Sequence, residues 1–259
     1  MRRMILLAVL GSAALALPSA ASALPTVTFK ALAVQIPGFR GTGNIYGAGA
    51  AVQAEYSIVG SEYFGSPPPV IGVNFYLPKG TVLHPSGFPT CNEQVLRQTG
   101  PIGCPKASKA GPIGTVLGFV TFGGERVEEP AELFSFYKPG GGLIFFTDGH
   151  SPTSLEIYSS GSYLNLHGAA GYGPELKTIV PLVPSVPGAP FASVKNITVK
   201  AGSAIKVHGK PVYYGRVPKK GQCPKGGFNV KTEVIFAENG EETKPVSVTK
   251  TYKAPCPRR

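Results

Sequence analysis

The sequence predicts an all-β protein, in which an antiparallel β-sandwich or jelly-roll-like domain is followed by a smaller, disulfide-clamped β domain. Composition is the first reason: the 259 residues include 34 glycines and 26 prolines but no tryptophan, which favours strands and turns over helices. The second is spacing, because β-branched and aromatic runs recur about every 8–12 residues between Gly and Pro turns. The third is the lack of long helical patterns, since 92–98 is the one short helix candidate.

The N-terminus predicts a signal peptide over residues 1–23. Arg2 and Arg3 precede an apolar run from Met4 to Leu17, and Ala21-Ser22-Ala23 fits a small-residue cleavage site. The remaining 236 residues carry 23 basic and 14 acidic side chains, a formal charge of +9. No later run is apolar and long enough for a transmembrane helix. We therefore expect a secreted or cell-surface protein with no transmembrane segment in the mature chain.

Residues 24–178 are expected to form the β-sandwich domain. Residues 87–114 interrupt it as a long irregular loop that contains Cys91 and Cys104. The expected strands are 26–36, 50–59, 70–77, 115–122, 133–138, 143–148, 154–158 and 162–166.

Residues 179–191 predict an extended linker. Prolines at 181, 184, 187 and 190 each remove a backbone donor and disfavour helix. The charge also changes here, because residues 24–175 hold eight basic and ten acidic side chains, whereas 176–232 hold ten basic and no acidic ones. We expect 192–259 to form a small basic β domain, with strands at 194–200, 204–208, 212–217, 228–236 and 246–252.

The last two of these strands flank Asn239-Gly240, a strong hairpin signal. A two-residue turn would place Cys223 opposite Cys256 but would put valines opposite charged residues. A register with Val234 opposite Val246 keeps the apolar residues on one face. We therefore expect this second register, with a three-residue loop and a bulge near the cysteines.

Four cysteines remain in the mature chain, an even number that predicts two disulfides in an exported protein. Three connectivities are possible, and the local pairs Cys91–Cys104 and Cys223–Cys256 are favoured over the crossed ones. Neither pair has the close spacing of a zinc knuckle, so no metal site is expected. The closure of the thirteen-residue loop between Cys91 and Cys104 is worth about 3 kcal/mol in the loop-entropy model.

The segment FTDGHSPTSLE contains the best catalytic candidates, Asp148, His150 and Glu156. The carboxylate of Asp148 could orient the imidazole of His150, which could then act as a base or bind a metal. The competing interpretation, which we favour, is a turn in which Asp148 bonds its own backbone. Whether the protein is an enzyme stays open, with a non-enzymatic role favoured.

Two further patterns are weaker candidates for functional sites. Glu125, Glu128, Glu129 and Glu132 could supply a glycosidase pair, but such a cluster is more typical of a solvated turn or edge. The glycine-rich stretch 41–49 resembles a phosphate-binding loop, but no helix is predicted after it. We therefore expect no nucleotide and no cofactor.

The basic segment between residues 195 and 231 is the stronger functional signal, because nine cations occur in 37 residues without an acid. Such a field attracts polyanions such as anionic polysaccharides or cell-wall polymers. A solvated face that keeps the protein soluble is the competing interpretation. The candidate binding residues are Lys195, Lys200, Lys206, Lys210, Arg216, Lys219, Lys220, Lys225 and Lys231.

Several runs together resemble a family of exported, uncharacterised all-β proteins from actinobacteria: 67–91 (PPPVIGVNFYLPKGTVLHPSGFPTC), 103–114, 139–152, 180–194 and 212–228. The resemblance implies export and a similar plan of loops and disulfides, and it assigns no activity, cofactor or catalytic residue.

The expected function is therefore non-enzymatic binding of an anionic cell-surface or extracellular polymer through the basic segment. The alternatives are an extracellular glycan hydrolase or lyase, and a structural or assembly protein of the cell surface.

Overall fold

The computed structural model describes residues 24–34, 36, 49–168, 171–216 and 224–255. The described residues do not include the expected signal peptide, Lys219, Lys220 or the Cys223–Cys256 pair. Within these ranges, no helix has the length and apolar character needed to cross a membrane.

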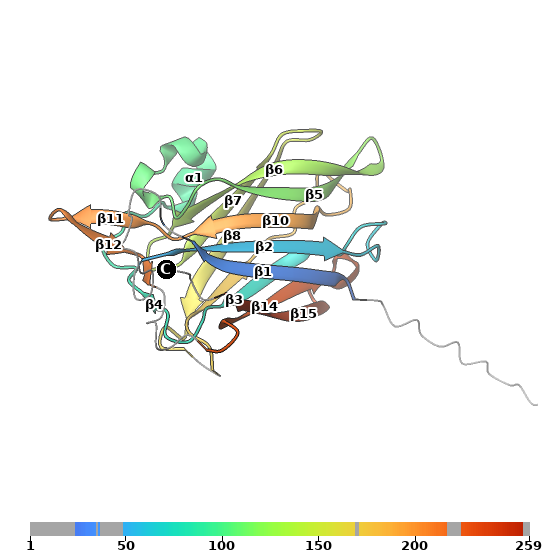
Figure 1. The fold of residues 1–259 in the computed structure, drawn as a ribbon. Helices are drawn as coiled ribbons and strands as arrows, with labels where there is room; N and C mark the ends of the chain where they lie inside the picture. The colour runs from blue at the N-terminus through green and yellow to red at the C-terminus, as the bar shows by residue number, and fades with distance from the viewer. Residues whose placement is uncertain (1–23, 35, 37–48, 169–170, 217–223, 256–259) are drawn as a thin grey trace, which may run out of the picture.

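Eleven strands form one antiparallel sheet in the order β1-β2-β10-β5-β6-β7-β8-β9-β3-β14-β15, which confirms the all-β class (Figure 1). Two small two-stranded sheets, β11–β12 and β4–β13, accompany it. The strands are β1 (Thr26–Val34), β2 (Ala51–Val59), β3 (Val70–Tyr76), β4 (Val82–Leu83), β5 (Gly114–Phe122), β6 (Glu125–Tyr137), β7 (Leu143–Gly149), β8 (Leu155–Leu164), β9 (Glu175–Ile179), β10 (Ser193–Ala201), β11 (Ala204–Val207), β12 (Lys210–Tyr213), β13 (Gly215–Arg216), β14 (Phe228–Ala237) and β15 (Pro245–Ala254).

The arrangement differs from a sandwich domain (24–178) followed by a separate small domain (192–259). Strand β10 lies between β2 and β5, and β14 pairs with β3. Residues on both sides of 179–191 therefore share one sheet and one hydrophobic core. The reason is physical: the apolar faces of β10 and β14 have too few strands of their own to cover them, so they pair with strands of the first part.

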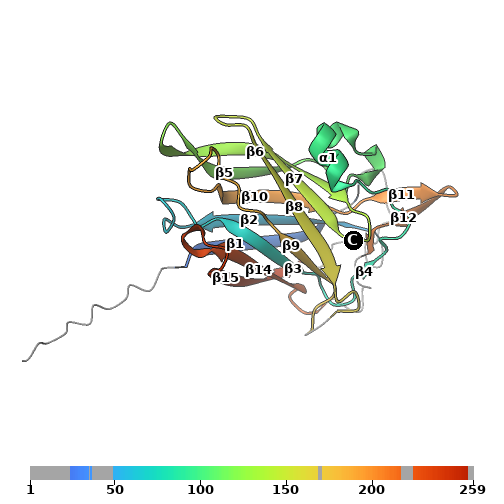
Figure 2. The same cartoon turned by 180° about the vertical axis from the view of Figure 1, so that it is seen from behind.

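The large sheet rolls around until its first and last strands lie side by side, as two opposite views show (Figures 1 and 2). The rings of Phe29 on β1 and Tyr252 on β15 meet edge to face, with centroids 6.2 Å apart. Strands twist in one direction, and a long twisted sheet curls rather than staying open. The rolled sheet has an inner face that is shielded from solvent and an outer face.

Part of the interior is filled by aromatic side chains. The ring of Phe29 lies 5.1 Å from that of Tyr56 and 5.8 Å from that of Phe75. The Tyr56 hydroxyl is hydrogen-bonded to the Thr232 hydroxyl at 3.1 Å, and the latter also donates to the Asn74 carbonyl. These contacts join β1, β2, β3 and β14 across the interior.

Helix α1 (Glu93–Thr99) and the disulfide Cys91–Cys104 cover part of the outer face. The Asn92 side chain accepts a hydrogen bond from the backbone N–H of Gln94 and so caps the helix. Leu96 is fully buried and packs with both cysteines against β6 and β7. The predicted short helix and the Cys91–Cys104 pair are thus confirmed.

The proline-rich segment 179–191 connects β9 to β10 and lies against neighbouring loops. Its Ser185 hydroxyl donates to the Thr121 carbonyl and accepts from the Thr121 N–H. The guanidinium of Arg126 donates to the Phe191 carbonyl and to the hydroxyls of Ser66 and Ser193. The segment is therefore anchored to the strand ends it passes.

The predicted hairpin β14–β15 is present, but the expected register is wrong. Val234 pairs with Val248 rather than with Val246, and the connection runs over 238–244 instead of three residues. It begins with a 3-10 turn, Glu238–Gly240, in which Asn239 has a φ of 53°. The apolar residues still share one face, because the observed and expected registers differ by an even number of residues.

Candidate ligand cavity

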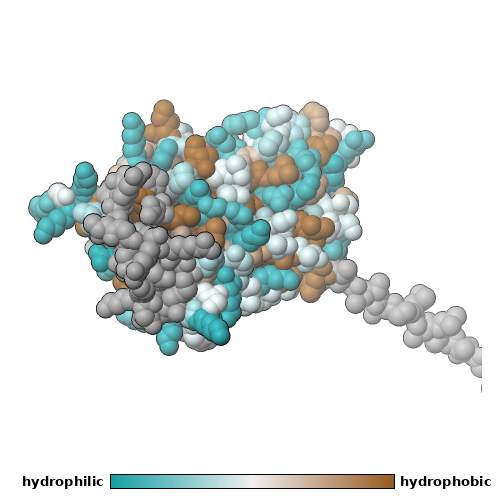
Figure 3. Space-filling view, in the orientation of Figure 1, coloured by the Kyte–Doolittle hydropathy of each residue, from teal (hydrophilic) through white to brown (hydrophobic). Residues whose placement is uncertain are grey.

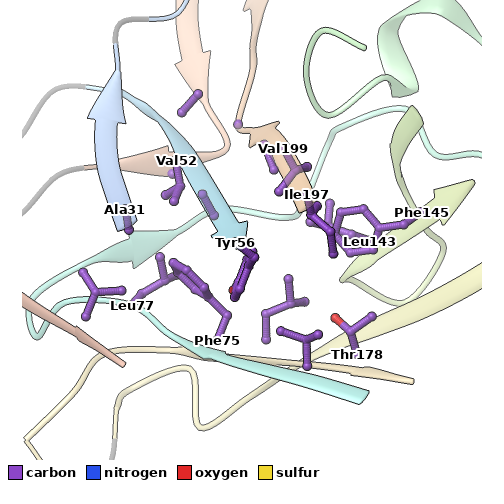
Figure 4. A pocket seen from close by; sticks show the side chains of 18 of the residues that line it. Ala31, Val52, Tyr56, Phe75, Leu77, Leu143, Phe145, Thr178, Ile197 and Val199 are labelled. Carbon is purple, nitrogen blue, oxygen red and sulfur yellow. The ribbon is translucent and has the colours of Figure 1, made fainter. Parts of the chain in front are cut away.

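The interior contains a cavity of about 250 Å³, bordered by strands from all around the rolled sheet (Figure 4). Six of the apolar residues that line it come from six different strands: Val52, Val73, Val116, Ile157, Leu176 and Val199. In an engineered protein, an apolar cavity of roughly 150 Å³ stays dry and binds benzene. The present cavity is larger and comparably apolar.

These lining residues have an unusual exposure for side chains inside a protein. Val52, Val116, Ile157 and Val199 lie on the inner face, yet each is only partly buried. Buried aliphatic side chains normally pack on all sides, because protein interiors are as dense as organic crystals. We conclude that the cavity leaves real apolar surface without a protein partner.

The number of strands and the size of the wall residues explain the cavity. Rolled sheets of about eight strands have an interior that side chains just fill, and the diameter grows with strand number; here there are eleven. On β1 and β2, small residues face the interior at Ala31, Ala33 and Ala54. Large aromatic residues gather in two parts of the interior, one around Tyr56 and one around Tyr137.

Three tyrosines line the cavity near the ends of β6, β8 and β12. The rings of Tyr137 and Tyr214 are stacked with centroids 4.0 Å apart, and that of Tyr163 lies 6.1 Å from Tyr214. The Tyr137 hydroxyl accepts from the Ser203 N–H and shares a hydrogen bond with the Ser203 hydroxyl. Burial raises the pKa of all three tyrosines, that of Tyr214 to about 12, so these hydroxyls are neutral at physiological pH.

Arg216 is the only charged residue among the described residues that line the cavity. It lies on β13, next to Gly215 and Tyr214, where β13 pairs with β4 through Val82. The residue is exposed. The cavity therefore has one cation in its wall, close in sequence to Tyr214, while its other described lining residues are uncharged and mostly apolar.

The predicted catalytic residues lie elsewhere. Asp148 and Glu156 are opposite one another on β7 and β8, and the imidazole Nε2 of the exposed His150 is 3.3 Å from the Asp148 carboxylate. The Glu156 carboxylate accepts a hydrogen bond from the Tyr158 hydroxyl. None of Asp148, His150 and Glu156 lines the cavity. The structure brings the three residues near one another on the outer face, on the same side as Phe146 and α1.

The four glutamates of β6 have separate environments. Glu129 is buried, and its carboxylate accepts hydrogen bonds from the Thr153 N–H and hydroxyl, which ties down the β7–β8 connection. Glu128 forms an ion pair with Lys195. Glu125 and Glu132 are exposed, and Glu132 lies opposite Asp148. Over the described residues, no group of three or more His, Cys, Asp or Glu side chains could hold a metal ion.

The predicted basic binding residues divide into two sets. Lys195 contacts Glu128 near the far end of β10, and Lys231 on β14 places its Nζ 3.7 Å from the centroid of the Tyr76 ring. The other described members lie on elements at the end of the molecule that carries hairpin β11–β12 (Figure 1). This set, which we call the basic end, comprises Lys200, Lys206, Lys210, Arg216 and Lys225. The projecting hairpin itself is largely hydrophilic in Figure 3.

Sequence reasoning identified Arg216 as a binding candidate but missed the cavity. The inward residues were recognised as strand residues, but alternation looks the same for a filled interior and a hollow one. The small residues at Ala31, Ala33 and Ala54 were the available signal.

No family model, no curated protein and no solved structure matches this chain. The resemblance to an exported actinobacterial family therefore stays a prediction.

Proposed function

We propose that the protein binds an apolar small molecule inside its rolled sheet and that it does so outside the cell, as the N-terminal sequence predicts. The observation that carries the proposal is the 250 Å³ cavity, whose aliphatic walls are only partly buried. Ligand sites are typically concave and mostly apolar, with a few polar groups that orient the ligand. Arg216 and Tyr214 supply such groups here.

The energetic argument follows from the surface left uncovered. Burial of apolar surface is worth about 25 cal/mol per Å², and Val52, Ile157 and Val199, which are only partly buried, gain only part of it from protein contacts. A ligand that fills the space gains the contacts that the walls lack. Because the walls come from strands around the whole sheet, the site is largely formed before the ligand arrives.

The first test is binding of a neutral fluorescent probe, N-phenylnaphthylamine, to protein stripped of lipid on a hydrophobic resin. We expect enhanced fluorescence with one saturable site per chain. Val199→Phe places a larger side chain in the cavity and should abolish the enhancement. Thr198→Phe is the matched control, because the neighbouring residue on the same strand faces outward, and its binding should be unchanged.

Two results would overturn the proposal. One is the absence of saturable enhancement with the wild-type protein. The other is equal enhancement with Val199→Phe and Thr198→Phe, which would mean that the probe adsorbs to the outer surface. Thermal melts of all three proteins separate loss of the site from loss of the fold.

Binding of an anionic polymer is a second candidate, favoured by the basic end. Lys206 and Lys210 both lie on hairpin β11–β12, Lys206 opposite Pro211 and Lys210 opposite Val207. Both are exposed, and among the described residues neither forms an ion pair. Salt-sensitive pelleting with cell-wall sacculi would support it, and pelleting that is indifferent to ionic strength would count against it.

A further inference from the structure

We infer that the ligand is a single-chain amphiphile with an anionic head group, bound with its head at Arg216 and its chain in the cavity. This inference rests on the proposed function and adds the chemical class and orientation of the ligand. It follows from the asymmetric distribution of charge along the cavity wall.

The first step concerns the wall itself. Around its circumference the cavity presents aliphatic and aromatic side chains, including Val73, Val116 and Phe145. The described lining residues include no acid and no lysine or histidine. A ligand with a charge in its middle, or with several charges, would have to bury them without partners, which is costly. The chain of the ligand must therefore be uncharged.

The second step concerns the end formed by β4 and β13. Arg216 is exposed there, and Tyr214, two residues earlier, is buried and also lines the cavity. A guanidinium offers several N–H donors in a planar fork that matches a carboxylate, phosphate or sulfate. Because the cation is partly in water while the cavity behind it is apolar, this end suits the head of an amphiphile.

The third step is the field around Arg216. The basic end adds Lys200, Lys206, Lys210 and Lys225 on neighbouring elements. A surplus of positive charge at one end attracts anions and repels cations. A ligand with a cationic head is thereby disfavoured.

The experiment compares three probes that share one alkyl chain: dodecanoate, dodecanol and dodecyltrimethylammonium. Affinities are measured by displacement of N-phenylnaphthylamine from the lipid-stripped protein, below the critical micelle concentrations of the two ionic probes and below the solubility limit of dodecanol. We expect dodecanoate to bind at least about tenfold more tightly than the alcohol, which corresponds to about 1.4 kcal/mol. The ammonium probe should bind most weakly.

Variants assign the preference to one side chain. Arg216→Gln should weaken dodecanoate binding by about tenfold and leave dodecanol binding within twofold, whereas Arg216→Lys should retain part of the preference. Lys210→Gln is the matched control, because it removes one positive charge from the same end without altering a cavity residue, and it should change dodecanoate binding less than twofold.

The outcomes separate the two proposals. If the alcohol binds as tightly as dodecanoate, or if Arg216→Gln weakens both probes equally, the head-group inference is wrong and the apolar site stands. If Lys210→Gln weakens dodecanoate as much as Arg216→Gln does, the general field rather than Arg216 selects the anion, and the assignment fails. If none of the probes displaces the fluorophore and the fluorophore itself does not bind, both proposals fail.

Discussion

The disulfide Cys91–Cys104 offers a prediction whose magnitude follows from its sequence separation. The double substitution Cys91→Ser and Cys104→Ser opens a loop closed over a separation of 13 residues. The loop-entropy model assigns about 3 kcal/mol to such a closure. For a chain of this size, 1 kcal/mol corresponds to roughly 2–4 °C in Tm. We therefore expect the Tm to fall by about 6–12 °C.

The location of the disulfide adds a second expectation, which concerns probe binding. Cys91, Cys104 and Leu96 pack on the outer face of β6 and β7, whereas the cavity lies on the inner face of the same strands. The double variant should therefore keep its far-ultraviolet β spectrum and bind N-phenylnaphthylamine as the wild type does. The assay is thermal unfolding followed by circular dichroism, with and without the probe.

Two results would refute this reasoning. A Tm within about 2 °C of the wild type would mean that the loop is held by packing alone. Loss of probe binding at a temperature where the β spectrum is retained would mean that the outer clamp shapes the cavity, which the separation of the two faces does not predict.

Three further predictions concern the interior, the anchored segment and the outer face. Burial raises the pKa of Tyr214 to about 12, whereas an unfolded tyrosine releases its proton near pH 10. The free energy of unfolding should therefore fall by up to about 1.4 kcal/mol per pH unit between about pH 10 and about pH 12. A Tm that stays flat above pH 10 would contradict this. Arg126→Met removes the donors to Phe191, Ser66 and Ser193 and should lower the unfolding free energy by about 1.5–3 kcal/mol, measured by urea denaturation; an unchanged midpoint would show that the segment 179–191 is held without Arg126. His150→Ala removes an exposed side chain and should change stability by less than about 0.5 kcal/mol and leave probe binding unaltered; a loss of probe binding would connect the outer face to the cavity.

The sequence was most informative where local rules decide the structure. The pattern over 92–98 predicted the short helix, and the local spacing of Cys91 and Cys104 favoured their pairing. Alternating apolar residues located most of the strands. These features depend on a few neighbouring residues, so no knowledge of the rest of the chain was needed.

The predicted strand boundaries are wrong where hydrogen bonding to neighbouring strands overrides the local conformational preference. Ser159–Gly161 was expected to break a strand, but β8 runs through it because both neighbours, β7 and β9, bind its backbone. Strand β6 begins at Glu125 rather than at residue 133, since the whole of β5 pairs with residues 125–133 of β6. The hairpin register was missed because residues 238–244 contain two successive turns, and the Lys244–Glu241 ion pair belongs to the second.

The division of the chain into two parts failed for a related reason. Prolines and a change in charge mark residues 179–191 as a connection, and they are one. However, sequence composition does not reveal which strands a connection leads to. Strand β10 inserts between β2 and β5, so the charge difference separates strands of one sheet rather than two domains. The basic residues were consequently expected on one face, and Lys195 and Lys231 lie apart from the basic end.

The cavity depends on a property that binary patterning does not encode. Larger side chains at Ala33, Ala54 or Val199 would keep the same alternation of apolar and polar residues and would fill the interior, and filling a cavity commonly raises stability by about 0.5–2 kcal/mol. Instead, small side chains face the hollow at these positions, while Phe29, Tyr56 and Phe75 pack against one another at its edge. The same chain thus contains both a dense core and an unfilled one, and strand number alone does not explain the difference. The proposed ligand would need this space, which is why we place the proposed function at the cavity rather than at the carboxylates of the outer face.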